Sequence, residues 1–370
     1  MRSPDWGAYG SVGRFVWAWS RDEAALVQDE LELVAPSGAR LATTRFRRQD
    51  AEPGPAWILI HGLTSTGRHH HSLVRLARGF AASGATVVIP EVRAWTELEL
   101  APRLTDEVVL AGLDALEADP LVRGRPGLIG FSFGGAQALR VAGLEPARGR
   151  LSCVGSLGGY ADIGDALQFL FTGEIAHAGG TTRLVPDSYG LWVIALNYLD
   201  KLPGYERCGP VLDAMRSMCI EACDRYLPTW GPGVRRLRAQ QRARLDPEHW
   251  PLFDLLAPAG PGDAGFDRDW ARRLAQELAE FGLAHDPELR FPDGFELDIP
   301  AFLIHGRDDD LSPFTQTLAL AEAFEAPELH VEVSGLLAHS QDAPWPKQPG
   351  IEALRLARLF ARMLERVRAG

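Results

Sequence analysis

Residues 128–135 read LIGFSFGG, which places Ser132 between Gly130 and Gly134 in a G-x-S-x-G pattern. A Pro-Gly turn and a short apolar run precede the serine, and residues 136–142, AQALRVA, have the composition of a helix. Between a strand and a helix, this pattern is typical of a turn so tight that side chains two residues either side of the serine would collide. The sequence therefore predicts that Ser132 is exposed at the tip of a strand, above helix N–H groups that favour negative charge.

Strand and helix patterns alternate on both sides of this turn. Residues 30–34 and 41–46 alternate in polarity around a Pro-Ser-Gly turn, which is typical of a hairpin. Unbroken apolar runs predict strands buried on both faces, and a last strand and several helical runs complete the pattern. The buried runs are 56–60, 86–89, 128–131, 151–157 and 299–304, the last strand is 329–333, and the helical runs include 73–80, 104–116, 314–324 and 351–367. The predicted fold class is α/β, with a mostly parallel central sheet covered by helices on both faces.

The alternation stops between about residues 165 and 288. This stretch contains helix-like runs and Gly/Pro loops, and it shows no convincing strand pattern. The helix-like runs are 190–199, 211–226, 235–245 and 269–281. Because the strand pattern resumes afterwards, the block is interpreted as an inserted, mainly helical cap. The predicted units are a first core part at 1–164, in which the packing of 1–29 is left open, the cap at 165–288, and a second core part at 289–370.

Composition limits the partners of the chain. Its 370 residues are 46% hydrophobic and 24% charged, which suits a globular core. The net charge of −11 argues against a nucleic-acid partner, since such partners need a face rich in Lys and Arg. The N-terminus lacks a basic and then apolar signal pattern, and no apolar run reaches membrane-spanning length. We therefore expect a soluble cytoplasmic enzyme with no membrane partner.

The aromatic-rich start and the cysteines are given structural interpretations. We expect the start to pack on the body of the protein or on a neighbouring subunit, so a homo-oligomer remains possible; its aromatic residues are Trp6, Tyr9, Phe15, Trp17 and Trp19. The four cysteines are too few for a disulfide-stapled scaffold, and reduced thiols are expected. Cys219 and Cys223 lie one helical turn apart without a cluster of partner ligands. The run His69-His70-His71 cannot face one ion, because adjacent helical residues point about 100° apart. No metal and no cofactor are expected.

Four motifs occur in an order that resembles the α/β-hydrolase family. They are His61-Gly62 after a strand, the turn at Ser132, an acid after a late strand, and a histidine near the end. The chain order Ser…Asp…His separates this family from other serine hydrolases. The resemblance spans about residue 31 to the C-terminus, apart from the inserted block. It implies the α/β-hydrolase fold, with the turn acting as a nucleophile elbow.

The resemblance implies a catalytic triad in which Ser132 is the nucleophile. A free hydroxyl is a poor nucleophile at neutral pH, so a base must remove its proton. His339 lies just after the last predicted strand, where the family places its base. His61 and His305 each sit in a strand-ending His-Gly, a pattern that more often shapes a turn. The sequence therefore predicts His339 as the base.

The acid is expected after the strand ending at residue 304, where three aspartates follow one another. Similar enzymes show His-Gly-x-x-Asp, with a proline four residues beyond the acid. Counting from His305 selects Asp309, and Pro313 then falls at the expected place. A buried carboxylate there would fix the tautomer of the catalytic histidine. Asp308 remains the alternative.

The oxyanion hole is expected to use two backbone N–H groups, those of Leu63 and Phe133. Each such donor typically contributes roughly 3 kcal/mol of transition-state stabilisation. Apolar cap residues are predicted mostly to form the cap's own core, while a minority line an acyl pocket. The residues predicted to bind substrate are Phe131, Phe169, Phe171, Trp192 and Tyr198.

The leading functional hypothesis is a serine esterase that cleaves a small-molecule carboxylic ester, apolar or bulky, through an acyl-enzyme. A second hypothesis within the family is another acyl bond: amide, peptide, thioester, lactone or carbon–carbon. The alternative from a different class is a non-catalytic scaffold that binds a small ligand. Intact Ser132, Asp309 and His339 argue against that alternative, because binding alone does not require all three.

Overall fold

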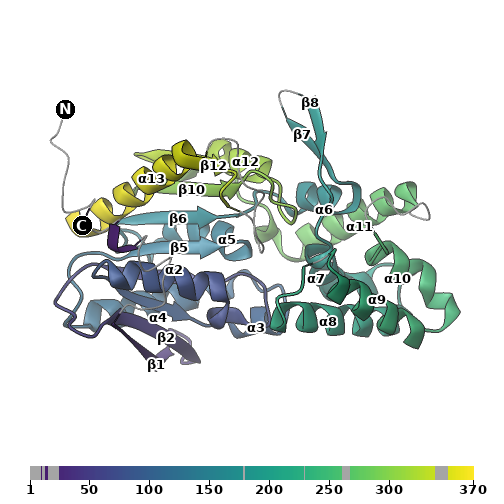
Figure 1. The fold of residues 1–370 in the computed structure, drawn as a ribbon, viewed down its shortest axis with the longest axis horizontal. Coiled ribbons are helices and arrows are strands. Elements are labelled where there is room, and N and C mark those ends of the chain that lie inside the picture. Colours follow the sequence, from purple (N-terminus) through teal and green to yellow (C-terminus); the bar gives the residue numbers. More distant parts are fainter. Residues whose placement is uncertain are drawn as a thin grey trace.

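The computed structural model describes residues 10, 13–15, 25–177, 180–228, 230–260, 267–337 and 349–370. At its centre lies an eight-stranded sheet in the order β1-β2-β4-β3-β5-β6-β10-β12 (Figure 1). The first two pairings are antiparallel and the others are parallel, which confirms the predicted mostly parallel sheet. Its strands are β1 (Leu26–Val34), β2 (Arg40–Arg48), β3 (Ala56–Ile60), β4 (Thr86–Pro90), β5 (Gly127–Phe131), β6 (Cys153–Leu157), β10 (Ala301–Gly306) and β12 (Leu329–Ser334).

Two layers of helices bury the faces of this sheet. Strand β3 is buried at every residue, and its side chains alternate between the two faces, with Ile58 and Ile60 on one and Trp57 and Leu59 on the other. The first face is covered by α4 (Leu104–Ala118), α5 (Phe133–Ala142) and α12 (Thr315–Ala323). The second is covered by α2 (His71–Ala82) and α13 (Pro349–Ala369). Burial on both faces explains why these strands read as continuous apolar runs.

The chain reverses its direction of winding between β3 and β5. It leaves β3 through α2 to reach β4 on one side, and then passes back through α4 to β5 on the other side of β3. In open α/β sheets, the crevice outside the carboxyl ends of the strands at such a reversal is where ligands bind. Both the His61-Gly62 motif and Ser132 follow directly after these two strands. The topology therefore places them at the same edge of the sheet.

A mainly helical segment, which we call the insert (residues 163–289), emerges between β6 and β10. In Figure 1 it lies beyond the end of the sheet toward which β5 and β6 run. Its helices are α6 (Ile163–Thr172), α7 (Tyr189–Tyr198), α8 (Gly209–Asp224), α9 (Pro232–Arg244), α10 (Trp250–Leu256) and α11 (Arg268–His285), with short 3-10 helices η2 (Leu199–Lys201), η3 (Pro247–His249) and η4 (Pro287–Leu289). Buried residues of the insert belong to the same hydrophobic cluster as the α4 and α5 face of the sheet. The insert therefore packs continuously on the core.

The expectation that this block contains no strand was wrong at one place. Strands β7 (Glu174–His177) and β8 (Gly180–Arg183) form an antiparallel hairpin after α6. Every residue of β8 is exposed, so this strand has no buried face to impose an apolar alternation on its sequence. The remaining short elements are η1 (Gly67–His69), α3 (Arg93–Thr96), β9 (Phe295–Glu296) and β11 (Phe324–Glu325).

Part of the aromatic N-terminal segment can be placed. The Phe15 ring is buried against Phe80 and Phe360, with ring centroids 5.2 and 5.1 Å apart. This contact agrees with the expected packing on the body of the protein, while Trp6, Tyr9, Trp17 and Trp19 lie outside the described residues. Within the described ranges, no helix combines the length and the apolar character needed to span a bilayer.

Candidate active site

The turn at Ser132 has the backbone geometry that the glycine pattern predicts. Ser132 has φ 52° and ψ −123°, a positive φ that L-residues rarely adopt. A Cβ atom on Gly130 would lie 1.9 Å from the Gly134 carbonyl oxygen, and one on Gly134 would lie 2.5 Å from the His61 oxygen. The Ser132 N–H donates to the Leu157 oxygen at 2.8 Å, which ties the turn to β6. The surrounding backbone therefore enforces the strained conformation and leaves no room for side chains at the two glycines.

The loop after β3 lies directly against the serine. A Cβ atom on Gly62 would lie 3.1 Å from Ser132 Cβ and 3.6 Å from Ser132 Oγ. Gly62, Leu63 and Ser132 are all half-buried among the described residues. The fold thus brings together the two segments expected to supply the oxyanion donors, the loop at Leu63 and the start of α5 at Phe133. The donor role of the two N–H groups stays a prediction.

His61 is held by its own neighbours as a structural group. Its Nδ1 lies 2.7 Å from the Gly62 oxygen, and its Nε2 accepts the Val92 N–H at 2.9 Å. Burial lowers the pKa of His61 to about 4, with a further lowering from the charge of Arg68. A neutral, fully bonded imidazole shapes this turn, as the His-Gly pattern suggested.

Asp309 is the buried member of the three aspartates after β10. It is 1% exposed, while Asp308 is exposed and Asp310 is half-buried. One carboxylate oxygen of Asp309 accepts the N–H groups of Leu311 at 3.0 Å and Ser312 at 2.8 Å. The spacing count and the burial therefore select the same residue. A buried carboxylate with fixed orientation is the arrangement that an acid partner of histidine requires.

His305 helps to fix this loop. Its Nε2 lies 3.3 Å from the second carboxylate oxygen of Asp309 and 2.8 Å from the Ser312 carbonyl oxygen. Its Nδ1 lies 2.6 Å from Thr317 Oγ1. The expected turn-shaping role agrees with these contacts, and the ring also positions the carboxylate. The predicted base, His339, lies outside the described residues.

Two observations decide the architecture. The mostly parallel sheet reverses its direction of winding between β3 and β5, and a serine at positive φ occupies the tight turn after β5. The chain has the α/β-hydrolase fold.

Solved structures with the α/β-hydrolase fold match almost the whole chain at low identity. Brefeldin A esterase, a bacterial homologue of human hormone-sensitive lipase, is 17% identical, with 100% of this chain and 89% of that one covered and a TM-score of 0.49. The hydrolase GrgF from Penicillium sp. sh18 is 18% identical over 93% of this chain and 100% of that one, with a TM-score of 0.46. An acylaminoacyl peptidase from Pyrococcus horikoshii is 12% identical, with a TM-score of 0.45; 93% of this chain is covered but only 42% of the peptidase.

No protein-family model matches the sequence, and no curated protein matches it. One fold hosts many unrelated functions, so the residues of the site itself carry the functional proposal.

The aromatic residues predicted to bind substrate are mostly buried inside the insert. Phe169, Phe171, Trp192 and Tyr198 are each less than 5% exposed, and Phe131 is half-buried at the end of β5. The Trp192 indole N–H donates to the Leu256 oxygen at 2.8 Å, and the Tyr198 hydroxyl donates to Asp286 at 2.7 Å. These contacts show packing roles, which were expected for most of the aromatic residues of the insert. An acyl pocket formed by some of them stays a prediction.

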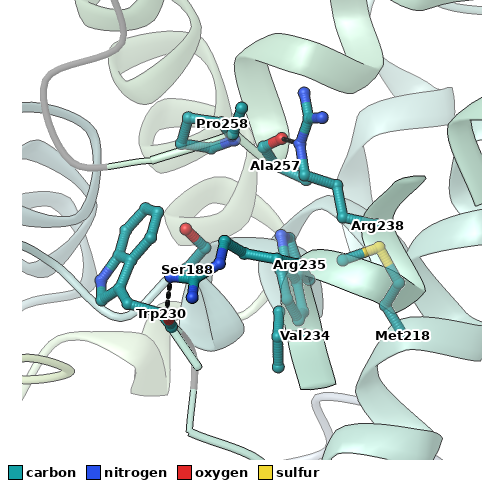
Figure 2. Close-up of a pocket in the computed structure, with 10 residues that line it drawn as sticks. Ser188, Met218, Trp230, Val234, Arg235, Arg238, Ala257 and Pro258 are labelled. Atoms are coloured by element: carbon teal, nitrogen blue, oxygen red, sulfur yellow. Dashed lines mark hydrogen bonds between the residues drawn. The ribbon is translucent and has the colours of Figure 1, made fainter. Parts of the chain in front are cut away.

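Two of the cavities among the described residues are lined by the insert alone. The first measures about 10 Å³ and is lined by Trp192, Trp230 and neighbouring side chains. Figure 2 shows Trp230 and Arg235 beside it, where the Arg235 guanidinium donates to the Trp230 oxygen at 2.5 Å. This first cavity has room for about one water molecule. The second measures about 180 Å³ and is lined by Phe171 together with mainly apolar residues and two arginines. Neither is lined by Ser132, so the described residues do not connect these cavities to the serine.

The structure adds residues that sequence reasoning missed. The Tyr189 hydroxyl, at the start of α7, donates to the Leu63 carbonyl oxygen at 3.0 Å, and the Cys223 thiol donates to the same hydroxyl at 3.2 Å. Ser65 Oγ donates to Asp224 at 2.9 Å. No local motif marks these positions, because each contact joins segments more than 30 residues apart in the sequence.

The three consecutive histidines lie at the edge of the same loop. His69 ends η1, His71 begins α2, and the rings of His70 and His71 pack on Tyr226 of the insert, with centroids 5.9 and 4.5 Å away. The pKa of His71 is lowered mainly by burial and also by the nearby charge of Arg75. The described residues contain no group of three side chains arranged to hold a metal ion.

Proposed function

We propose that the protein is a serine hydrolase that cleaves a carboxylic ester through an acyl-enzyme. The observation that carries the proposal is the position of Ser132, at positive φ on a glycine-flanked turn, with the Gly62 backbone against its side chain. A serine held in a strained, half-buried turn beside a second backbone segment suits nucleophilic attack and stabilisation of the resulting oxyanion. A scaffold that only binds a ligand has no need of such strain.

In the proposed mechanism, Ser132 attacks the ester carbonyl while His339 takes its proton. Asp309 would hold the imidazole in the correct tautomer and stabilise the imidazolium that forms. The N–H groups of Leu63 and Phe133 would donate to the developing oxyanion, and His339 would then protonate the departing alcohol. Water would release the acyl group in a second step with the same roles.

The fixed carboxylate supports the assignment of the acid. Asp309 is buried and receives two backbone N–H groups, so its orientation is set before any substrate binds. Asp308 is exposed, and a solvated carboxylate holds an imidazole less firmly. The insert is proposed to act as a cap that selects substrates, since it lies at the carboxyl edge of the sheet and contacts the loop at Leu63.

A fluorophosphonate probe tests the nucleophile directly. We expect labelling of Ser132, identified by peptide mass spectrometry, in the wild type, and none after denaturation of the protein. A panel of p-nitrophenyl esters of increasing acyl length, with matching anilides and thioesters, then identifies the bond. Labelling without ester turnover would favour another acyl bond, and a folded protein that is neither labelled nor active would favour the binding scaffold.

A further inference from the structure

The first residues of α7 lie between the two loops that flank the proposed site. On one side, the Tyr189 hydroxyl donates to the Leu63 carbonyl oxygen at 3.0 Å. On the other side, the Asp187 N–H donates to the Asp310 carbonyl oxygen at 2.6 Å, next to the proposed acid. A Cβ atom on Gly190 would come within 3.0 Å of Leu311 Cδ1. The insert therefore touches both the loop at Leu63 and the loop at Asp310 through residues 187–190, at and just before the start of α7.

The Tyr189 hydroxyl is constrained to point at Leu63. It accepts a hydrogen bond from the Cys223 thiol at 3.2 Å, and it donates its single proton to the Leu63 carbonyl oxygen. Within the described ranges no other donor reaches that carbonyl oxygen. Burial raises the pKa of Tyr189 well above its ordinary value, with further contributions from Cys223 and Cys219, so the donor stays protonated.

A second hydrogen bond from the insert holds the same loop. Ser65 Oγ donates to Asp224, at the end of α8, at 2.9 Å. Within the loop, the Gly67 N–H donates to the Thr64 oxygen at 3.0 Å, the His69 N–H donates to the Thr66 oxygen at 2.9 Å, and the hydroxyls of Thr64 and Thr66 lie 3.0 Å apart. Residues 62–66 thus depend on the insert for part of their conformation.

We propose that Tyr189 is a positioning residue for the oxyanion hole. By holding the Leu63 carbonyl, it anchors the peptide unit between Leu63 and Thr64. The preceding planar peptide unit carries the Leu63 N–H together with the Gly62 carbonyl, whose oxygen lies 2.7 Å from His61 Nδ1. With both units held, the Leu63 N–H stays aimed at the position of the developing oxyanion. This inference rests on the proposed function of Ser132. On this proposal the core supplies the N–H donors of the oxyanion hole, and the insert helps to hold one of them in position. Donors must be aimed in advance, because an oxyanion hole acts through preorganisation.

Tyr189→Phe is the direct test, since it removes only the hydroxyl. Removing a whole oxyanion donor typically costs about 10²–10³-fold in kcat, so a misaimed donor is expected to cost about 10–100-fold with KM changed less than about threefold. The matched control is Tyr205→Phe. Tyr205 is also half-buried in the insert, and its hydroxyl accepts the Trp270 indole N–H at 2.8 Å, away from the loop. Its kcat is expected to stay within about twofold of the wild type.

A thiono ester, in which sulfur replaces the carbonyl oxygen, separates positioning from general destabilisation. A well-formed hole prefers oxygen, so the ratio of ester to thiono ester rates should fall about tenfold in Tyr189→Phe and stay unchanged in Tyr205→Phe. Ser65→Ala, which keeps Tyr189 but removes the neighbouring bond, should lower kcat and the ratio in the same direction by a smaller factor. It also provides the test if Tyr189→Phe does not fold.

Equal kcat values and equal ester to thiono ester ratios in Tyr189→Phe and Tyr205→Phe would overturn the inference while Ser132 is still labelled by the fluorophosphonate. A drop in stability of Tyr189→Phe with an unchanged ratio would also overturn it, because the hydroxyl would then be purely structural. Absence of both labelling and turnover in the wild type would refute the proposed function, and the inference with it. The two failures are therefore distinguishable.

Discussion

The turn at Ser132 and the start of α7 face the same site, but their positions are determined in different ways. The turn carries a local steric requirement, since a Cβ atom on Gly130 would meet the Gly134 oxygen at 1.9 Å, and its neighbours on β3 and β6 add to it. The start of α7 is fixed by side-chain hydrogen bonds that reach across more than 100 residues, from Tyr189 to Leu63. The steric requirement of the turn produces a recognisable glycine motif in the sequence, whereas the contact between Tyr189 and Leu63 produces no motif. Changes in the core should therefore abolish chemistry on every substrate, while changes in the insert should adjust it.

The largest effect is expected from Ser132→Ala. Loss of the nucleophile should reduce turnover by roughly 10⁴–10⁶-fold for every ester in the panel and abolish fluorophosphonate labelling. His339→Ala should cost about as much, and the double variant no more than either, since triad members act as a unit. Initial rates on the panel, with circular dichroism to confirm folding, give the answer. Hydrolysis within tenfold of the wild type would mean that the turn carries no nucleophile.

The next effect separates the buried carboxylate from its exposed neighbour. Asp309→Asn should lower kcat by roughly 10²–10⁴-fold, because the histidine loses its orienting acceptor. Asp308→Asn, at an exposed position in the same loop, should stay within about threefold of the wild type. If Asp308→Asn is the crippling change, the acid is one residue earlier than the burial and the spacing indicate.

Alanine substitutions at one glycine in each region compare how much the two regions contribute to the free energy of unfolding. Gly130→Ala places a methyl group against backbone that cannot move aside, and it should lower the free energy of unfolding by at least about 4 kcal/mol. Gly209→Ala, at the start of α8 in the insert, meets no atom within 4 Å and should be neutral or stabilise by up to about 1 kcal/mol. Urea unfolding of both variants measures the difference. Similar unfolding midpoints in the two variants would contradict a turn fixed by close backbone contact.

The smallest expected effect is a loss of folding stability at low pH that is caused by His61. Burial lowers the pKa of His61 to about 4 from an ordinary value of 6.5, so between those pH values the unfolded chain binds more protons than the folded one. The stability contributed by neutral His61 is fully present above pH 6.5 and is lost as the pH falls toward 4, by about 3 kcal/mol in total.

Urea unfolding of the wild type and of His61→Gln at pH 7 and pH 4.5 checks this assignment. The variant should lose less stability between the two conditions than the wild type. His249→Gln, in the insert, is the control and should follow the wild type. An equal loss of stability in His61→Gln and the wild type would assign the acid sensitivity to other groups.

The order of the core elements could be predicted because burial imposes a pattern on sequence. The runs at 56–60 and 329–333 match β3 and β12 at their ends or within one residue, and the terminal helix at 351–367 lies within α13. The exposed hairpin β7–β8 was missed because its strands have almost no buried side to constrain them. The spacing count from His305 selected Asp309, and the structure shows that this is the buried aspartate of the three.

The sequence by itself determined the sheet and the tight turn at Ser132, and it singled out the aspartate after β10 that is buried, because glycines, apolar runs and fixed spacings act over a few residues at a time. Only the tertiary structure decided that Gly62 lies against Ser132, that His305 holds Asp309, and that Tyr189 reaches the carbonyl of Leu63. Hydrogen bonds between distant segments depend on where the whole chain brings a donor and an acceptor, and any tyrosine in the insert can serve as a donor. Position in space, rather than residue type, selects Tyr189.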